Sequence, residues 1–304
     1  MNECQSCPIC GGDDSRETIN KEFRGIVFAY NECNSCSILF RTGVDEVHQE
    51  SLYSYQEKWQ TLSREDAYPE LNAGRYRELL SDMSRRVKGK RLLDVGCGKG
   101  HFVYRAQEAG WDSLGIEVTD AAVSVAQRFE SPVIKQDFLE MKDSEFDVVS
   151  MFELVEHLAD PRMFLAKAQE VLAPGGLLFV TTPNRVSLDA RLAGSNWRAY
   201  DPEHLVLFSP PQLSGLVRDE GFEIVKLATR NMSPALIKQA TLRKFRLKPA
   251  RSTERSALPI RSEDQEIRRR IHSNAATSCL VDSVNAVISS TQIGSTIRLW
   301  ARKR

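Results

Sequence analysis

The 304-residue sequence has no surplus of either charge, since 41 Lys and Arg balance 41 Asp and Glu. A protein whose general partner is nucleic acid or an anionic membrane usually carries a basic excess, so neither class of partner is expected. No apolar run approaches the roughly 18 residues of a membrane span. No charged segment followed by a short apolar segment marks a secretion signal. We therefore expect a cytoplasmic protein without a membrane span.

Cysteine is scarce beyond the N-terminus, because five of the seven cysteines lie in the first 36 residues. In a reducing compartment such clustering favours metal binding over disulfides. Cys7 and Cys10 form one C-x-x-C pair, and Cys33 and Cys36 form another. Four thiolates on two tight turns suit a closed tetrahedral zinc site, so a zinc ribbon is expected over residues 1–43. Cys4 could replace a ligand, and unbound or redox-active thiols are the alternative.

A glycine-rich turn follows an apolar run that ends at Asp94. The three glycines of this turn are Gly96, Gly98 and Gly100, and a helical pattern begins at His101. Glycines allow a tight strand-to-helix turn and let a ligand lie against bare backbone. Taken alone, this motif would also suit a dinucleotide.

Strand-like and helix-like segments alternate around this turn. The expected strands are residues 91–95, 113–117, 133–134, 146–152, 177–182 and 222–229. The expected helices are residues 101–109, 120–129 and 161–172, with another beginning at Ser209. Such alternation predicts an α/β fold with a mostly parallel sheet and a ligand crevice at the carboxyl ends of its strands. A helical connector over residues 44–90 precedes it and would place Arg75 near the ligand or, alternatively, in solvent.

Acidic and aromatic residues follow several of the expected strands. Glu117 can accept two hydrogen bonds from a ribose diol, and Asp137, with Phe138 beside it, can accept from an adenine amino group. Phe152 can pack on the adenine or methionine part of a nucleoside ligand. Asp94 can orient an ammonium group. Each of these positions is a candidate cofactor-binding residue.

The order of these motifs resembles the class I S-adenosylmethionine-dependent methyltransferases. The resemblance rests on Leu-Asp-Val-Gly-Cys-Gly-x-Gly, Glu117, Asp137, Phe-Asp-Val-Val and Leu-x-Pro-Gly-Gly. It implies S-adenosylmethionine as cofactor and a seven-stranded, doubly wound sheet of order 3-2-1-4-5-7-6 with the seventh strand antiparallel. Residues 294–302 fit that strand, so the catalytic domain would comprise residues 91–230 and 294–304. Residues 231–293 would then be a basic and helical insertion that covers the acceptor site or supports a homodimer.

A narrower resemblance begins at Glu153-Leu154-Val155-Glu156-His157 and continues through Glu203-His204-Leu205. These motifs are similar to a branch that includes the ubiquinone-biosynthesis O-methyltransferases and many small-molecule methyltransferases. The resemblance implies that Glu153, Glu156 and His157 either bind a divalent ion or shape the loop and its neighbouring site. His204 and His157 are the candidate bases, because neutral histidine is available near pH 7. Trp197, Arg198 and Tyr200 would line the acceptor site or simply pack within their loop.

The expected activity is methyl transfer to a small molecule, preferably to a hydroxyl of a sugar or nucleotide-sugar intermediate. This preference for the acceptor rests on family analogy. Two alternatives stay open. One is an RNA methyltransferase that holds its target with the zinc ribbon, and the other is a non-catalytic scaffold that binds the cofactor.

Overall fold

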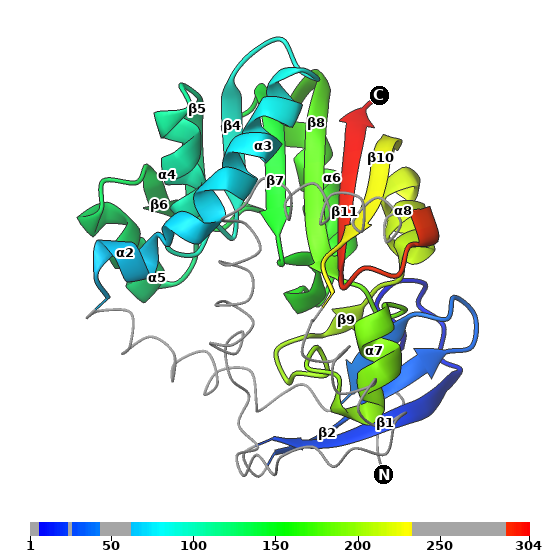
Figure 1. Ribbon diagram of the computed structural model, residues 1–304. Helices are drawn as coiled ribbons and strands as arrows, with labels where there is room; N and C mark the ends of the chain where they lie inside the picture. Colours follow the sequence, from blue (N-terminus) through cyan, green and yellow to red (C-terminus); the bar gives the residue numbers. More distant parts are fainter. Residues whose placement is uncertain (1–5, 24–25, 43–61, 233–289) are drawn as a thin grey trace.

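The computed structural model describes residues 6–23, 26–42, 62–232 and 290–304 (Figure 1). Two sheets organise these residues, a large one in the centre and a small one beside the carboxyl ends of its parallel strands. The helices expected over residues 45–60 and 263–288 lie outside the described residues. The same holds for most of the insertion and for its expected dimer contact.

The large sheet has seven strands in the order β10-β11-β8-β7-β4-β5-β6. The strands are β4 (Arg91–Val95), β5 (Asp112–Glu117), β6 (Val133–Lys135), β7 (Phe146–Phe152), β8 (Leu172–Pro183), β10 (Phe222–Arg230) and β11 (Thr296–Lys303). Numbered within the sheet, this is the expected order 3-2-1-4-5-7-6. β11 is antiparallel to both of its neighbours, as predicted. The fold class is therefore confirmed.

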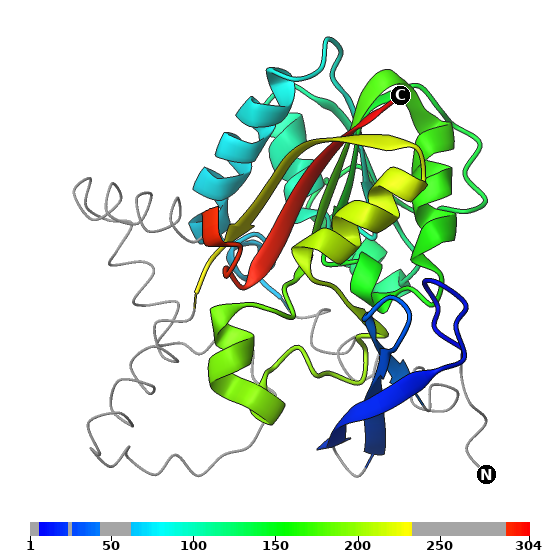
Figure 2. The same cartoon turned by 90° about the vertical axis from the view of Figure 1, so that its right-hand side faces the viewer.

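Helices cover both faces of this sheet, as the turned view shows (Figure 2). One face carries α3 (Ala73–Ser84), α4 (His101–Glu108) and α5 (Asp120–Arg128), and the other carries α6 (Pro161–Val171) and α8 (Pro210–Asp219). Shorter elements are α2 (Arg64–Ala67), α7 (Leu188–Ala193), η1 (Glu70–Asn72), η2 (Val155–His157) and η3 (Gly194–Asn196). None of the described helices is long and apolar enough to cross a membrane.

Alternation along β11 shows how one strand serves two cores. Ile297 and Leu299 pack with α6 and α8, whereas Trp300 packs with α3 and α4 on the opposite face. Successive side chains of a strand point to opposite faces, so a strand covered on both sides is apolar at nearly every position. Arg298 interrupts this apolar run and is itself only 6% exposed.

The Pro174-Gly175-Gly176 segment was expected to close the helix before a strand over residues 177–182, but it lies within that strand. β8 already begins at Leu172, which pairs with Phe146 of β7. The register then shifts, so that Val148 pairs with Leu177. The segment is therefore a bulge near the start of β8, a feature that allows a local change of direction within a strand.

The small sheet combines the N-terminal segment with a loop of the catalytic region. β1 (Ser15–Phe23), β2 (Ile26–Cys33) and β3 (Leu39–Thr42) are antiparallel, and β9 (Val206–Leu207) adds a fourth strand beside β3. Figure 1 shows this blue module next to β9 and α7. The N-terminal segment therefore packs directly on the chain that follows β8. Its description as a separate domain stays a prediction.

Candidate functional site

The glycine turn lies at the carboxyl end of β4 and has left-handed backbone at all three glycines. The φ angles of Gly96, Gly98 and Gly100 are +65°, +54° and +76°. A Cβ at Gly96 would lie 2.8 Å from the Leu154 side chain, whereas a Cβ at Gly98 would meet nothing within 4 Å. Gly96 thus fits closely against the chain after β7, and Gly98 leaves its outer side open. This is the arrangement that a backbone-binding ligand requires.

Glu117 holds the turn through its carboxylate at the end of β5. One oxygen accepts a hydrogen bond from the Gly98 N–H at 2.9 Å. The other accepts from the N–H groups of Val118 and Thr119 at 2.9 and 3.0 Å. A carboxylate offers about four lone-pair sites, of which these bonds use three, so the half-buried group can still accept a hydrogen bond from a diol.

Asp94 is buried beneath the turn, with 2% of its surface exposed. Burial raises the pKa of this carboxyl to about 7, the charge of Glu117 adds to the effect, and the Ser150 hydroxyl opposes it. That hydroxyl donates to the Asp94 carboxylate at 2.7 Å. A bound cation would favour the ionised carboxylate, so the position suits a ligand ammonium group.

The remaining candidate cofactor-binding residues differ in how exposed their side chains are. Phe152 is half-buried and packs on Phe102, with ring centroids 4.6 Å apart. Asp137 is exposed and accepts a hydrogen bond from the Leu139 N–H at 2.9 Å. Phe138 is 2% exposed within the main core, so only its backbone can reach a ligand. Arg75 lies in the first turn of α3, and its Nε is buried without a hydrogen-bond partner.

Two histidines meet at the carboxyl edge next to this turn. The centroids of the His157 and His204 rings lie 4.8 Å apart in a T-shaped arrangement. Nδ1 of His157 is 2.9 Å from the Glu203 carbonyl oxygen, and Nδ1 of His204 is 2.8 Å from that of Ala199. Carbonyl oxygens only accept, so Nδ1 of each ring carries a proton. The structure thus brings together the two predicted bases.

Glu156 lies behind the histidines and is fully buried. The Thr182 hydroxyl donates to one carboxyl oxygen at 2.9 Å, and the other oxygen has no hydrogen-bond partner. Burial raises the pKa of this carboxyl well above its usual value, and the charge of Glu153 adds to the shift. One ligand atom each from Glu156, His157 and His204 lies within 4.8 Å of the others. Glu153 is exposed, has φ of +46° and stands outside this group.

The small sheet supports the loop that carries His204. The buried Tyr30 hydroxyl lies 2.8 Å from the Asp201 carbonyl oxygen and 2.7 Å from that of His204. Trp197 and Tyr200 pack in the same cluster as Tyr30, so both side chains serve loop packing. The sequence did not predict this contact, because Tyr30 and His204 lie 174 residues apart in the chain.

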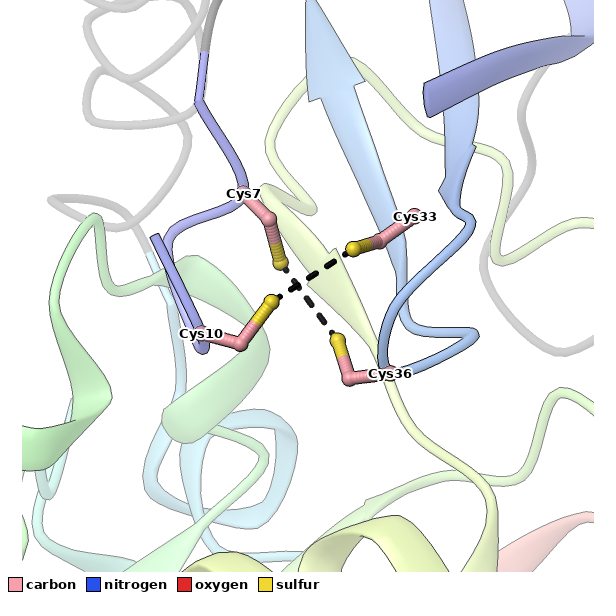
Figure 3. A group of neighbouring side chains, drawn as sticks. All are labelled: Cys7, Cys10, Cys33 and Cys36. Carbon is pink, nitrogen blue, oxygen red and sulfur yellow. Dashed lines mark hydrogen bonds between the residues drawn. The ribbon is translucent and has the colours of Figure 1, made fainter. Parts of the chain in front are cut away.

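The four cysteines of the two C-x-x-C pairs converge at the edge of the small sheet (Figure 3). Their sulfurs lie within 4.8 Å of one another, with 3.6 Å between Cys7 and Cys36 and 3.5 Å between Cys10 and Cys33. Zn–S bonds of about 2.3 Å in a tetrahedron require S···S distances of about 3.8 Å. Burial opposes ionisation of Cys33, yet the N–H groups of Cys36 and Ser35 lower its pKa to about 7. The donor set therefore fits zinc.

The sheet order and the glycine turn define the class of the protein, a methyltransferase of the class I fold. Residues 68–227, more than half of the chain, match the family described as "Methyltransferase domain", and the chain belongs to this family. It is therefore an S-adenosylmethionine-dependent methyltransferase, as the sequence motifs predicted.

Characterised relatives and solved structures agree with this assignment. A ubiquinone biosynthesis O-methyltransferase from Aromatoleum aromaticum is 29% identical over 192 residues, which cover 58% of this chain and 81% of the relative. A probable S-adenosylmethionine-dependent methyltransferase from Mycolicibacterium smegmatis is 27% identical over 154 residues, which cover 49% of this chain and 58% of the relative. A methyltransferase structure from Archaeoglobus fulgidus has the same fold, with a TM-score of 0.51 and 22% identity. The match covers 83% of this chain and 99% of that structure.

Proposed function

We propose that this methyltransferase methylates a hydroxyl group of a small-molecule acceptor, preferably of the sugar or nucleotide-sugar class. The observation that carries the choice of a hydroxyl is the His157–His204 pair, whose rings lie together beside the glycine turn with each Nδ1 bonded to a carbonyl oxygen. Leu154 connects the two regions, because it precedes η2 and abuts Gly96. Relatives named O-methyltransferases support an oxygen acceptor.

The donor would lie across the carboxyl ends of β4, β5 and β6. Glu117 would bind the ribose diol, Asp137 the adenine amino group and Asp94 the ammonium group. The backbone of the glycine turn, Phe152 and Arg75 would hold the remainder. When bound, S-adenosylmethionine supplies an electrophilic methyl group to a nucleophile that approaches in line with the sulfonium bond.

His204 would act as the general base for the acceptor hydroxyl. Its Nδ1–H bond to the Ala199 carbonyl oxygen fixes the ring, so Nε2 is free to accept the hydroxyl proton as the oxygen attacks. His157 would orient the acceptor or share this role. Glu153, exposed at the end of β7, would contact the acceptor from the neighbouring strand.

Zinc in the Cys7, Cys10, Cys33 and Cys36 site would serve structure. The four sulfurs already lie at tetrahedral spacing, and their module holds the His204 loop through Tyr30. We expect one zinc ion per chain in metal analysis of the purified protein. A protein that retains its native fold and thermal stability after complete zinc removal would contradict this role.

A divalent ion at Glu156, His157 and His204 is a second candidate, because their ligand atoms cluster within 4.8 Å. Methyl transfer would then fall upon mild chelation that leaves one zinc per chain. Unchanged transfer would favour the base mechanism.

The proposed acceptor class is tested with methyl-labelled donor and separate pools of nucleotide sugars, free sugars, catechols and RNA. Label in a sugar-containing pool is expected, whereas label only in RNA would contradict the proposal.

A further inference from the structure

Arg298 is a buried cation that forms no ion pair with the described residues. It lies on β11, the second strand from one edge of the large sheet, and is 6% exposed. Its Nε is fully buried and has no hydrogen-bond partner. A guanidinium in this state loses hydration without compensation, which proteins normally avoid. Its presence calls for a partner that the described residues do not supply.

Charged groups of both signs surround Arg298, namely Arg75, Arg230, Glu78 and Glu153. Burial lowers its pKa to about 9, and the charges of Arg75 and Arg230 add to the effect more than Glu78 and Glu153 oppose it. Glu78 forms an ion pair with Arg230 at 3.4 Å, so its charge is already shared. The unpaired Nε of Arg298 is therefore a donor that an anion would stabilise.

The position of Arg298 places it on the acceptor side of the site. In the sheet Arg298 is paired with Thr181, and the Thr181 carbonyl oxygen accepts a hydrogen bond from the Glu153 N–H. β11 stands three strands away from β4, which carries the glycine turn. At about 4.8 Å per strand this separation is about 14 Å, more than the length of an arginine side chain. An anion on Arg298 is therefore separate from the glycine turn.

We propose that Arg298 binds an anionic group of the acceptor, a phosphate or a carboxylate. The inference rests on the proposed methyl transfer to a small molecule and specifies its acceptor further. A planar guanidinium fork matches two oxygens of either anion, and the low-dielectric surroundings strengthen the bonds. The anion would fix one end of the acceptor while its hydroxyl meets His204 and His157.

The test compares wild type with Arg298→Met and with Arg218→Met, a control that removes an exposed cation from α8. Calorimetry at constant ionic strength measures binding of inorganic phosphate and of benzoate to protein saturated with S-adenosylhomocysteine. We expect at least one anion to bind wild type and the control equally, and to bind Arg298→Met roughly 10- to 100-fold more weakly. Thermal unfolding without ligand should show Arg298→Met at least as stable as wild type, because the substitution removes an uncompensated charge.

Three outcomes would overturn the proposal. Equal anion binding by wild type and Arg298→Met, or none by wild type, removes the site. A lower melting temperature of Arg298→Met would show a structural arginine. Competition between phosphate and S-adenosylhomocysteine, with both weakened in Arg298→Met, would assign the anion to the donor. If S-adenosylhomocysteine itself fails to bind wild type, the proposed function fails, and the anion titration of the ligand-free protein still decides the fate of Arg298.

Discussion

The donor and acceptor regions of this methyltransferase differ in how completely the chain satisfies their buried carboxylates. In the donor region, Glu117 accepts three backbone hydrogen bonds and Asp94 is paired with Ser150. In the acceptor region, Glu156 retains a buried oxygen without a hydrogen-bond partner, and Nε of Arg298 is buried without one as well. Each such group costs about 1–3 kcal/mol while unpaired. The donor cradle is therefore preformed, whereas the acceptor region is built to be completed by a ligand.

The two regions also differ in their origin along the chain. The donor cradle comes from consecutive strands, β4 to β7, within residues 91–152. The acceptor region combines a tyrosine of β2, a turn after β7, a loop before β9 and an arginine of β11. Substitutions in the acceptor region should therefore change transfer without changing donor binding, and the following predictions test this separation.

The largest effect is expected for His204→Gln. Removing a general base should lower the rate of methyl transfer by about 10²- to 10⁴-fold. Affinity for S-adenosylhomocysteine should stay within about threefold, which corresponds to less than 1 kcal/mol. His157→Gln is the matched comparison, and its smaller effect would identify His204 as the base. A parallel loss of donor affinity in His204→Gln would contradict the separation of the two regions.

Asp94 should make the ligand-free protein less stable as pH rises. Its pKa is raised to about 7 in the folded chain, so the folded state holds this proton more tightly than the unfolded state. The contribution of this proton to the free energy of unfolding is on the order of 4 kcal/mol. It is complete below the unfolded pKa near 4 and is lost as the pH rises from about 4 to 7.

Urea unfolding of wild type and Asp94→Asn between about pH 5 and 8 measures this contribution. The free energy of unfolding should fall with pH more steeply in wild type than in the variant. Identical pH dependence of the two proteins would show that Asp94 ionises normally in the folded state.

Gly98→Val should weaken S-adenosylhomocysteine binding by about 100-fold, because the new side chain occupies the open side of the turn and strains a left-handed backbone. Gly194→Val is the control, since Gly194 also has φ of +54° and open space around its Cβ position but is the first residue of η3. Calorimetry should show normal donor affinity in the control. Equal losses in both variants would attribute the effect to backbone strain alone.

Tyr30→Phe should have the smallest effect. The substitution removes the hydroxyl that bonds the carbonyl oxygens of Asp201 and His204. Loss of about 1 kcal/mol should lower kcat/KM by about fivefold and leave donor binding unchanged. Tyr104→Phe, on α4, is the control for loss of a tyrosine hydroxyl elsewhere. Unaltered transfer in Tyr30→Phe would show that the small sheet does not position the His204 loop.

Local sequence predicted the donor region well because each of its parts is a short contiguous pattern. The apolar run to Asp94, the glycine turn and the acid at 117 each lie at the predicted strand end, and the sheet order is the predicted one. The pairing of β9 with β3 has no comparable pattern, since two residues join strands from distant parts of the chain. The sequence shows Arg298 as a charge inside the apolar run Ile-Arg-Leu-Trp. Its charged neighbours come from other elements, including α3, and could not be predicted from this run.

The most direct measurement is calorimetric titration of S-adenosylhomocysteine into wild type, Glu117→Ala and His204→Gln. A preformed donor cradle predicts one-to-one binding of equal affinity in wild type and His204→Gln. In Glu117→Ala the loss of the carboxylate that holds the Gly98 N–H should weaken binding at least about 100-fold. Absence of binding to wild type, or equal affinity in wild type and Glu117→Ala, would contradict the assignment of the glycine turn and Glu117 as the donor site.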